Sequence, residues 1–249
     1  MKRVKFCLLV SFLLLLVGCA KSDVKVLNEK ILENKTDMEK AKSLVVIVPG
    51  YELVQSKYPK FFVDFASKFL GVDNNDEWSE DFAGYVRSNS NCDVEIFKWN
   101  PGLTERFSFK PAANDLADLL RKRENYKDVT IFSKSFGGIV SQLALGELNG
   151  EKNPKRLVYV ATPQKSANPN LPDDIEVINV FSKDDKLARR ANILLHWSNI
   201  YELEGRVNIE LSGLAHSEFN HNGEVIYEGR NTKLYDLYVQ LITASLPQE

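Results

Sequence analysis

The 249-residue chain has few of the residues that build metal sites or phosphate-binding loops. Its three histidines and three cysteines do not occur at the spacings of zinc ligands. It contains no G-x-G-x-x-G or GK[ST] pattern, so a nucleotide-binding domain is disfavoured. It also has no internal repeat and no low-complexity segment. We therefore expect an ordinary globular domain with no metal and no cofactor.

An excess of positive charge is also absent. The formal net charge is −2, from 32 basic and 34 acidic residues. Residues 1–18 hold three basic and no acidic residues, so their removal would change the charge from −2 to −5. A mildly acidic protein lacks the basic surface that binds a phosphate backbone, so we expect no nucleic-acid partner.

The amino terminus has the pattern of a targeting segment. Lys2, Arg3 and Lys5 precede the apolar run FCLLVSFLLLLV, which is shorter than the roughly 18 to 20 residues needed to span a bilayer. The run ends in LVGC, residues 16–19, which resembles a bacterial lipobox. The alternatives are an ordinary secretory signal and a short membrane anchor.

The lipobox resemblance implies a lipoprotein signal peptide at residues 1–18 and a diacylglycerol on the sulfur of Cys19. Residues 19–42 would then be a charged tether between the lipid and the domain. The protein would lie in the cell envelope, with the membrane as its partner through the lipid. Ala20, in place of aspartate, implies the outer membrane if the organism is Gram-negative. Because Cys7 leaves with the signal, only Cys92 remains in the domain, which excludes an intramolecular disulfide.

Residues 43–249 alternate between apolar, β-rich runs and helical patterns, as expected for one domain with a parallel sheet covered on both faces. Ligands of such sheets gather at the carboxyl ends of the strands. Strands are expected within residues 44–50, 92–100, 128–135, 156–163, 175–185 and 206–216, and helices within 58–70, 111–126, 137–150 and 232–246.

The segment SKSFGG, residues 133–138, lies where the third expected strand meets a helix. A serine on so sharp a turn, here Ser135, is typical of a nucleophile elbow. Gly137 and Gly138 supply small residues after it, but Ser133 stands where the G-x-S-x-G pattern has glycine. Ser133 is small enough for the turn to close, and it is either a bystander or a hydrogen-bonding partner of the turn. The alternative is a tight connection whose glycines serve helix packing.

A serine nucleophile needs a base, and the base needs an acid that orients it. His216 follows the last expected strand and is the favoured base. His196 lies in a helical pattern and His221 in a polar loop, so both are weaker candidates. The acid is expected from Asp184 or Asp185, which follow the fifth strand.

Taken in order, the segments VPG, SKSFGG, FSKDD and GLAH resemble the α/β-hydrolase family, and the resemblance covers the whole of residues 43–249. It implies a minimal sheet of about six mostly parallel strands with helices on both faces and little or no cap. It selects Asp185 as the acid beside Ser135 and His216, with Asp184 as runner-up. It further implies an oxyanion hole made by the backbone N–H groups of Phe136 and Tyr51.

The function implied is that of a membrane-anchored serine hydrolase that cleaves carboxylic esters through an acyl-enzyme. A thioesterase or an acyltransferase would use the same residues, and a catalytically inactive binding lipoprotein is the alternative of another class. Residues 164–174 are too few for a substantial cap, so we expect a monomer with an open site. Loops at 71–90 and 100–110 would bound that site, with Arg106 as a polar contact.

Overall fold

The computed structural model describes residues 43–50, 78–99, 109–148, 151, 154–194, 197 and 199–243. Several predictions lie outside these residues. They are the signal and tether up to residue 42, the helix at 58–70, Tyr51, Arg106 and His196.

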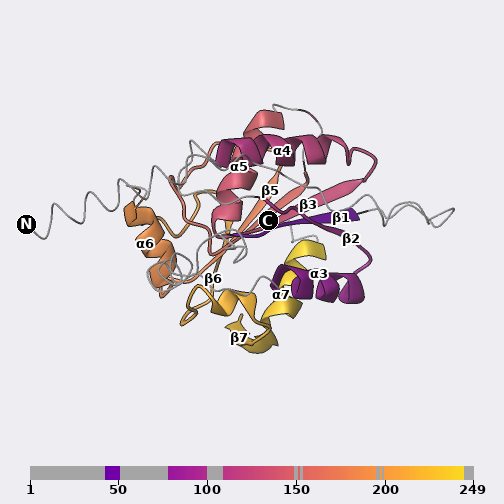
Figure 1. The fold of residues 1–249 in the computed structure, drawn as a ribbon. Helices are drawn as coiled ribbons and strands as arrows, with labels where there is room; N and C mark the ends of the chain where they lie inside the picture. The colour runs from indigo at the N-terminus through magenta and orange to yellow at the C-terminus, as the bar shows by residue number, and fades with distance from the viewer. Residues whose placement is uncertain are drawn as a thin grey trace, which may run out of the picture.

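Six strands form one parallel sheet in the order β2-β1-β3-β4-β5-β6 (Figure 1). The chain leaves β1 toward β2 on one side and returns to β3 on the other. The crevice beyond the carboxyl ends of β1 and β3 is therefore a topological switch point, where ligands of open α/β sheets bind. The six strands of the sheet are β1 Ser43–Val48, β2 Asp93–Ile96, β3 Asp128–Lys134, β4 Arg156–Val160, β5 Glu176–Phe181 and β6 Val207–Glu210.

Helices cover both faces of the sheet, as predicted. Helices α4 (Lys110–Arg121) and α5 (Phe136–Leu148) pack on one face, and α3 (Trp78–Asn89) and α7 (Leu234–Thr243) on the other (Figure 1). Successive side chains of a strand point to opposite faces, so every residue of a doubly covered strand is buried. In β1, Leu44 and Val46 belong to the core under α4 and α5, while Val45 and Ile47 belong to the core under α3 and α7.

The structure corrects the prediction of a loop at 71–90, because residues 78–89 form α3. Trp78, Phe82 and Val86 recur every four residues and are all buried, which gives the helix its apolar face. Glu80 and Asp81 lie in its first turn, where acidic side chains favour the helix dipole.

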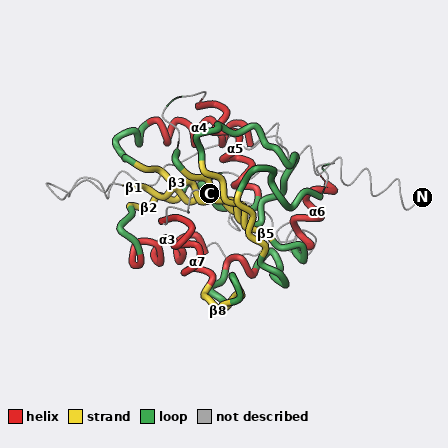
Figure 2. The backbone as a smooth tube through the Cα atoms, turned by 180° about the vertical axis from the view of Figure 1, so that it is seen from behind, coloured by secondary structure: helices red, strands yellow, loops and turns green. Residues whose placement is uncertain are grey.

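An antiparallel hairpin that was not predicted precedes the last helix. Strands β7 (Glu224–Tyr227) and β8 (Arg230–Lys233) form it, and it lies beside α7 (Figure 2). The predicted terminal helix therefore begins at Leu234, because residues 232 and 233 belong to β8.

Arg156, the first residue of β4, joins α7 to the sheet through hydrogen bonds. Arg156 forms an ion pair of 2.6 Å with Glu176 and donates hydrogen bonds to the backbone oxygens of Leu241 (2.9 Å) and Ile242 (2.7 Å). The last carbonyls of a helix have no partner within the helix, so a cation there satisfies them. In the part of the chain that the structure describes, no helix is both long and apolar enough to cross a membrane.

Candidate active site

Ser135 lies directly after β3 at the switch point, and its backbone is strained. Its φ of 52° is in the left-handed region, which costs a non-glycine residue about 1–2 kcal/mol. Its N–H donates to the Val160 oxygen (2.9 Å), and its own oxygen accepts from the N–H of Gly138 (3.0 Å). These bonds hold the turn in place, and strain held in this way is typical of functional sites. The residue as a whole is 8% exposed.

Two glycines let the chain pass close to this turn. A Cβ on Gly50 would lie 2.7 Å from the Cβ of Ser135, so the residue after Pro49 has to be small. A Cβ on Gly137 would lie 2.2 Å from the backbone oxygen of Val48 and 2.5 Å from that of Pro49. Helix α5 can therefore start against the end of β1 only with glycine at this position.

Ser133, which replaces the usual glycine of the elbow, is a hydrogen-bonding partner of α5. Its Oγ is 2.6 Å from Oγ of Ser141, which donates to the backbone oxygen of Gly137 (2.9 Å). Because the Ser141 hydrogen is used in that bond, the Ser133 hydroxyl donates to Ser141. The small Ser141 leaves room for a hydroxyl where a larger side chain would demand glycine.

Lys134 packs on the other face of the sheet. Its Nζ lies 5.7 Å from the ring centre of Trp78, the first residue of α3, and the side chain is buried. A cation over an indole ring is favourable. Ser133 and Lys134, the two residues before the strained serine, thus contact helices on opposite faces of the sheet.

The predicted base and acid meet at the same edge of the sheet. Nδ1 of His216 is 2.7 Å from Oδ2 of Asp185, and these side chains are 11% and 1% exposed. A carboxylate oxygen accepts hydrogen bonds, so the proton of this pair belongs on Nδ1 of the imidazole, and Nε2 is the ring nitrogen that can act as the base.

Asp185 has a second role as the N-cap of α6 (Lys186–Leu194). Its Oδ1 accepts hydrogen bonds of 2.9 Å from the backbone N–H groups of Leu187 and Ala188. Aspartate is among the best residues for this position. Both carboxylate oxygens thus have hydrogen-bond partners, as a buried polar group requires.

Asp184, the runner-up acid, contacts the backbone of the histidine loop and not the ring. Its Oδ2 accepts from the N–H of Gly213 (2.8 Å), and Gly213 adopts a φ of 82°, which favours glycine. Lys183 adds an exposed ion pair of 2.8 Å to Glu210 at the end of β6. Three successive residues of the acid turn therefore bind the segment that leads to His216.

The other predicted residues lie at the start of α5, in an exposed loop or outside the described residues. Phe136 is half-buried and is the first residue of α5, where backbone N–H groups have no partner within the helix. His221 is exposed after the 3₁₀ turn Glu218–Asn220. Tyr51 and Cys19 lie outside the described residues. Within the described ranges, no group of three or more His, Cys, Asp or Glu side chains is placed to hold a metal ion.

Sequence reasoning missed the contributions of Ser141 and Asp184 and a pocket behind Asp185. The signal for Ser141 was available, since a small residue on the first turns of α5 has to face position 133. The pocket has no sequence signal, because its walls come from β4, β5, α6 and residues 200–201.

Comparisons with known proteins concern the fold. No family model matches the chain, and no curated protein matches it. It is similar to the solved structure of a lidless α/β serine hydrolase from Xanthomonas campestris, with 14% identity, a TM-score of 0.47 and coverage of 83% of this chain and 82% of that one. It is also similar to a thioesterase of the prodiginine pathway of Streptomyces coelicolor, with 15% identity, a TM-score of 0.43 and coverage of 73% of this chain and 84% of that one. A third similar structure is that of a hyperthermophilic esterase from the archaeon Pyrobaculum calidifontis, with 13% identity, a TM-score of 0.42 and coverage of 74% of this chain and 72% of that one.

Proposed function

We propose that the protein is a serine hydrolase that cleaves carboxylic esters, with Ser135 as nucleophile, His216 as base and Asp185 as the orienting acid. One observation carries the proposal. A serine with left-handed backbone follows β3, at the sheet edge where a buried carboxylate holds the imidazole of His216 at 2.7 Å. Left-handed backbone at a serine is costly and is typical of functional sites, and a carboxylate that binds an imidazole has a direct use in acyl transfer.

The reaction follows from the hydrogen bonds of the base. Ser135 Oγ attacks the carbonyl carbon of the ester while Nε2 of His216 takes its proton, and Asp185 stabilises the imidazolium through Nδ1–H. The imidazolium then gives this proton to the departing alcohol. The acyl group stays on Ser135 until a water molecule, deprotonated by His216, releases it as the acid.

The negative charge that develops on the carbonyl oxygen needs donors. The N–H of Phe136 is one, since the first turn of α5 presents its amide groups and the positive end of the helix dipole. The family resemblance implies the N–H of Tyr51 as the second donor, and the preceding residue, Gly50, lies close enough to Ser135 that a Cβ there would be 2.7 Å from the serine Cβ. Removing one such donor typically costs about 3 kcal/mol of transition-state stabilisation.

Labelling with a fluorophosphonate probe tests the nucleophile. The wild type should be labelled, and Ser135→Ala should not. Ser133→Ala is the matched control, since it removes a hydroxyl two residues away and should still be labelled. An unlabelled wild type with native circular dichroism would instead favour the inactive binding protein. A panel of substrates separates the three activities. Release of free acid from esters marks a hydrolase, transfer of the acyl group to added alcohols marks an acyltransferase, and faster cleavage of thioesters marks a thioesterase.

We also propose that a lipid on Cys19 holds the protein at the membrane. The sequence LVGC at residues 16–19 supports this proposal. Metabolic labelling with an alkyne fatty acid should mark the wild type and Cys92→Ala but not Cys19→Ala. Labelling that persists in Cys19→Ala would refute the lipid anchor and leave the hydrolase proposal untouched.

A further inference from the structure

A second residue at this edge of the sheet shares the costly backbone of Ser135. Ala161, the first residue after β4, has a φ of 48°, in the left-handed region that residues with a Cβ avoid. It lies beside Ser135, since the preceding residues Lys134 and Val160 are paired. Its N–H donates to the Val180 oxygen (2.9 Å), as the N–H of Ser135 donates to the Val160 oxygen (2.9 Å). The proposed reaction uses no atom of Ala161, so this strained turn needs another explanation.

The turn at Ala161 changes the face of the sheet toward which the next side chain points. Successive residues of a strand alternate between faces, so an extended chain would place Thr162 on the same face as Val160. Val160 belongs to the core under α3 and α7. Thr162 contacts α5, which packs on the opposite face. The left-handed residue therefore reverses the alternation and brings Thr162 to the helix that follows the nucleophile.

Thr162 contacts the residue that closes the turn of the nucleophile. A Cβ on Gly138 would lie 2.3 Å from Oγ1 and 2.4 Å from Cγ2 of Thr162, so the threonine side chain lies directly against the Gly138 backbone. The N–H of Gly138 donates to the backbone oxygen of Ser135 (3.0 Å). Phe136, the proposed oxyanion donor, lies between these two residues at the start of α5. A shift of Gly138 would therefore move both the nucleophile and the donor.

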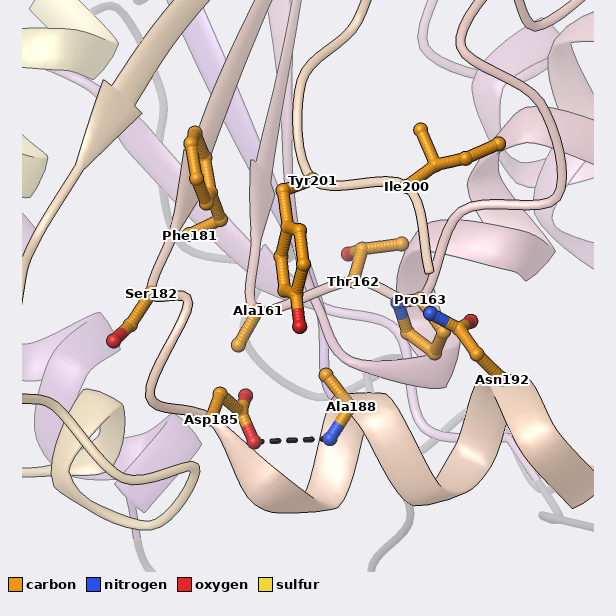
Figure 3. Close-up of a pocket in the computed structure, with 10 residues that line it drawn as sticks. All are labelled: Ala161, Thr162, Pro163, Phe181, Ser182, Asp185, Ala188, Asn192, Ile200 and Tyr201. Carbon is orange, nitrogen blue, oxygen red and sulfur yellow. Dashed lines mark hydrogen bonds between the residues drawn. The ribbon is translucent and has the colours of Figure 1, made fainter. Parts of the chain in front are cut away.

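A small pocket lies on the other side of Thr162. It has room for about one water molecule, and Asp185 and Asn192 are among the residues that line it (Figure 3). Without the Thr162 side chain, the first turn of α5 would face an enlarged cavity. The hydroxyl contributes little to this arrangement, because Oγ1 is 3.5 Å from the Val160 oxygen, at the limit of a hydrogen bond. The contact between Thr162 and α5 is therefore mainly one of shape.

We infer that Thr162 is a positioning residue of the active site and that the left-handed turn at Ala161 serves to place it. The Thr162 side chain holds the first turn of α5, so that Ser135 and the N–H of Phe136 keep the geometry that the transition state needs. This inference rests on the proposed function, since it concerns the same reaction. It also explains the second glycine of SKSFGG, because only a residue without a Cβ leaves room for Thr162.

Substitutions that change the shape of residue 162 test the inference, with p-nitrophenyl butyrate as substrate. Thr162→Ala should lower kcat about tenfold and leave KM unchanged, a fraction of the roughly 10²–10³-fold cost of losing an oxyanion donor. Thr162→Val is the conservative variant, which keeps the shape without the hydroxyl and should restore kcat. Thr162→Ser loses only the methyl group and should fall between them, so the series remains informative if Thr162→Ala does not fold.

Thr130→Ala is the matched control for these kinetics. Thr130 is 8% exposed, as is Thr162, but it lies in β3 five residues before Ser135, roughly 16 Å along the strand. Its loss should leave kcat at the wild-type value. A wild-type kcat in both Thr162→Ala and Thr162→Ser, or a Thr162→Val enzyme as impaired as Thr162→Ala, overturns the inference.

Amide hydrogen exchange, measured by NMR, follows the same turn without any ester. The N–H of Gly138 should exchange about tenfold faster in Thr162→Ala than in the wild type, because its bond to Ser135 opens more often. The N–H of Gly146, further along α5, is the internal reference and should not change. Faster exchange at Gly138 in a protein whose wild type cleaves no ester would keep the contact of Thr162 with this turn and refute the proposed function. Ester cleavage by the wild type, with equal exchange at Gly138 in both proteins, would refute the role of Thr162 alone.

Discussion

The serine and the histidine of the candidate site are positioned by different physical means. Ser135 is held mainly by steric fit and backbone hydrogen bonds, with a left-handed φ and two glycines that permit close backbone contacts. His216 is held by polar side chains, because Asp185 binds its ring and Asp184 binds the loop before it. Steric positioning is sensitive to single carbon atoms, whereas polar positioning is sensitive to charge and to hydrogen-bond direction. The two halves should therefore fail under different substitutions.

The largest expected effect is on the polar half. Asp185→Asn keeps an oxygen that can cap α6, so the free energy of unfolding should change by less than about 1 kcal/mol. The amide NH₂ would face Nδ1 and favour the wrong tautomer of His216, so kcat should fall about ten-thousand-fold. Kinetics with a p-nitrophenyl ester, alongside urea unfolding, would measure both. Activity within tenfold of the wild type would show that Asp185 does not orient the base.

The steric half should break at Gly137. In Gly137→Ala the new Cβ would meet backbone oxygens that cannot move aside, so unfolding should become easier by roughly 3 kcal/mol, and fluorophosphonate labelling should be lost. Gly146→Ala is the control in the same helix, because nothing lies within 4 Å of that Cβ. It should leave labelling intact and raise stability by about 0.5–1 kcal/mol through helix propensity. Equal stabilities of the two variants would contradict the steric account.

A smaller effect is expected where polar positioning is indirect. Asp184→Ala removes the acceptor for the N–H of Gly213, an exposed hydrogen bond worth about 1 kcal/mol. The histidine loop should loosen, and kcat should fall about fivefold, the rate equivalent of that energy. Lys183→Ala is the neighbouring control, since its exposed ion pairs are screened by solvent, and its kcat should match the wild type. A loss of activity in Asp184→Ala as large as in Asp185→Asn would mean that the roles of the two carboxylates have been confused.

The smallest effect concerns alkaline pH and lies away from the site. Burial raises the pKa of Tyr126 to about 12, helped by its hydrogen bond to Asp93, and burial raises the pKa of Tyr235 to about 12. Unfolded tyrosine loses its proton near pH 10, so between 10 and 12 the folded state binds more protons than the unfolded one. This stabilisation is complete below pH 10 and is lost as the pH rises through 12. The urea concentration at the unfolding midpoint should be lower at pH 11 than at pH 9. This difference should be smaller in Tyr126→Phe. Equal midpoints would refute the assignment.

The sheet could be predicted from the sequence because its strands are buried on both faces. Runs such as residues 44–48 are continuously apolar and rich in β-branched residues, which is typical of a strand buried on both faces. All six strands were confirmed, and strand ends identified where functional side chains should gather. The contact of His216 with Asp185 rather than with Asp184 followed the family resemblance and not the spacing, since adjacent residues at a strand end cannot be distinguished from sequence alone.

Other features could not be predicted, for identifiable reasons. The spacing of Trp78, Phe82 and Val86 does indicate a helix, but α3 is only twelve residues long and carries mixed polar residues between them. The β7–β8 hairpin buries Val225 while Ile226 is 71% exposed, so its alternation of apolar and polar residues is weak. The pocket at Asn192 depends on four separate segments meeting in space, which no local pattern encodes.

Asp185 starts a helix and also holds an imidazole, and this double duty constrains how the chain can evolve. Under the proposed function, a descendant that abandons catalysis is free to replace His216 with almost any residue. Position 185 would still be selected for a side chain that caps α6, such as aspartate, asparagine, serine or threonine. Among inactive relatives, the histidine should therefore vanish first, and the cap should outlast the chemistry it once supported.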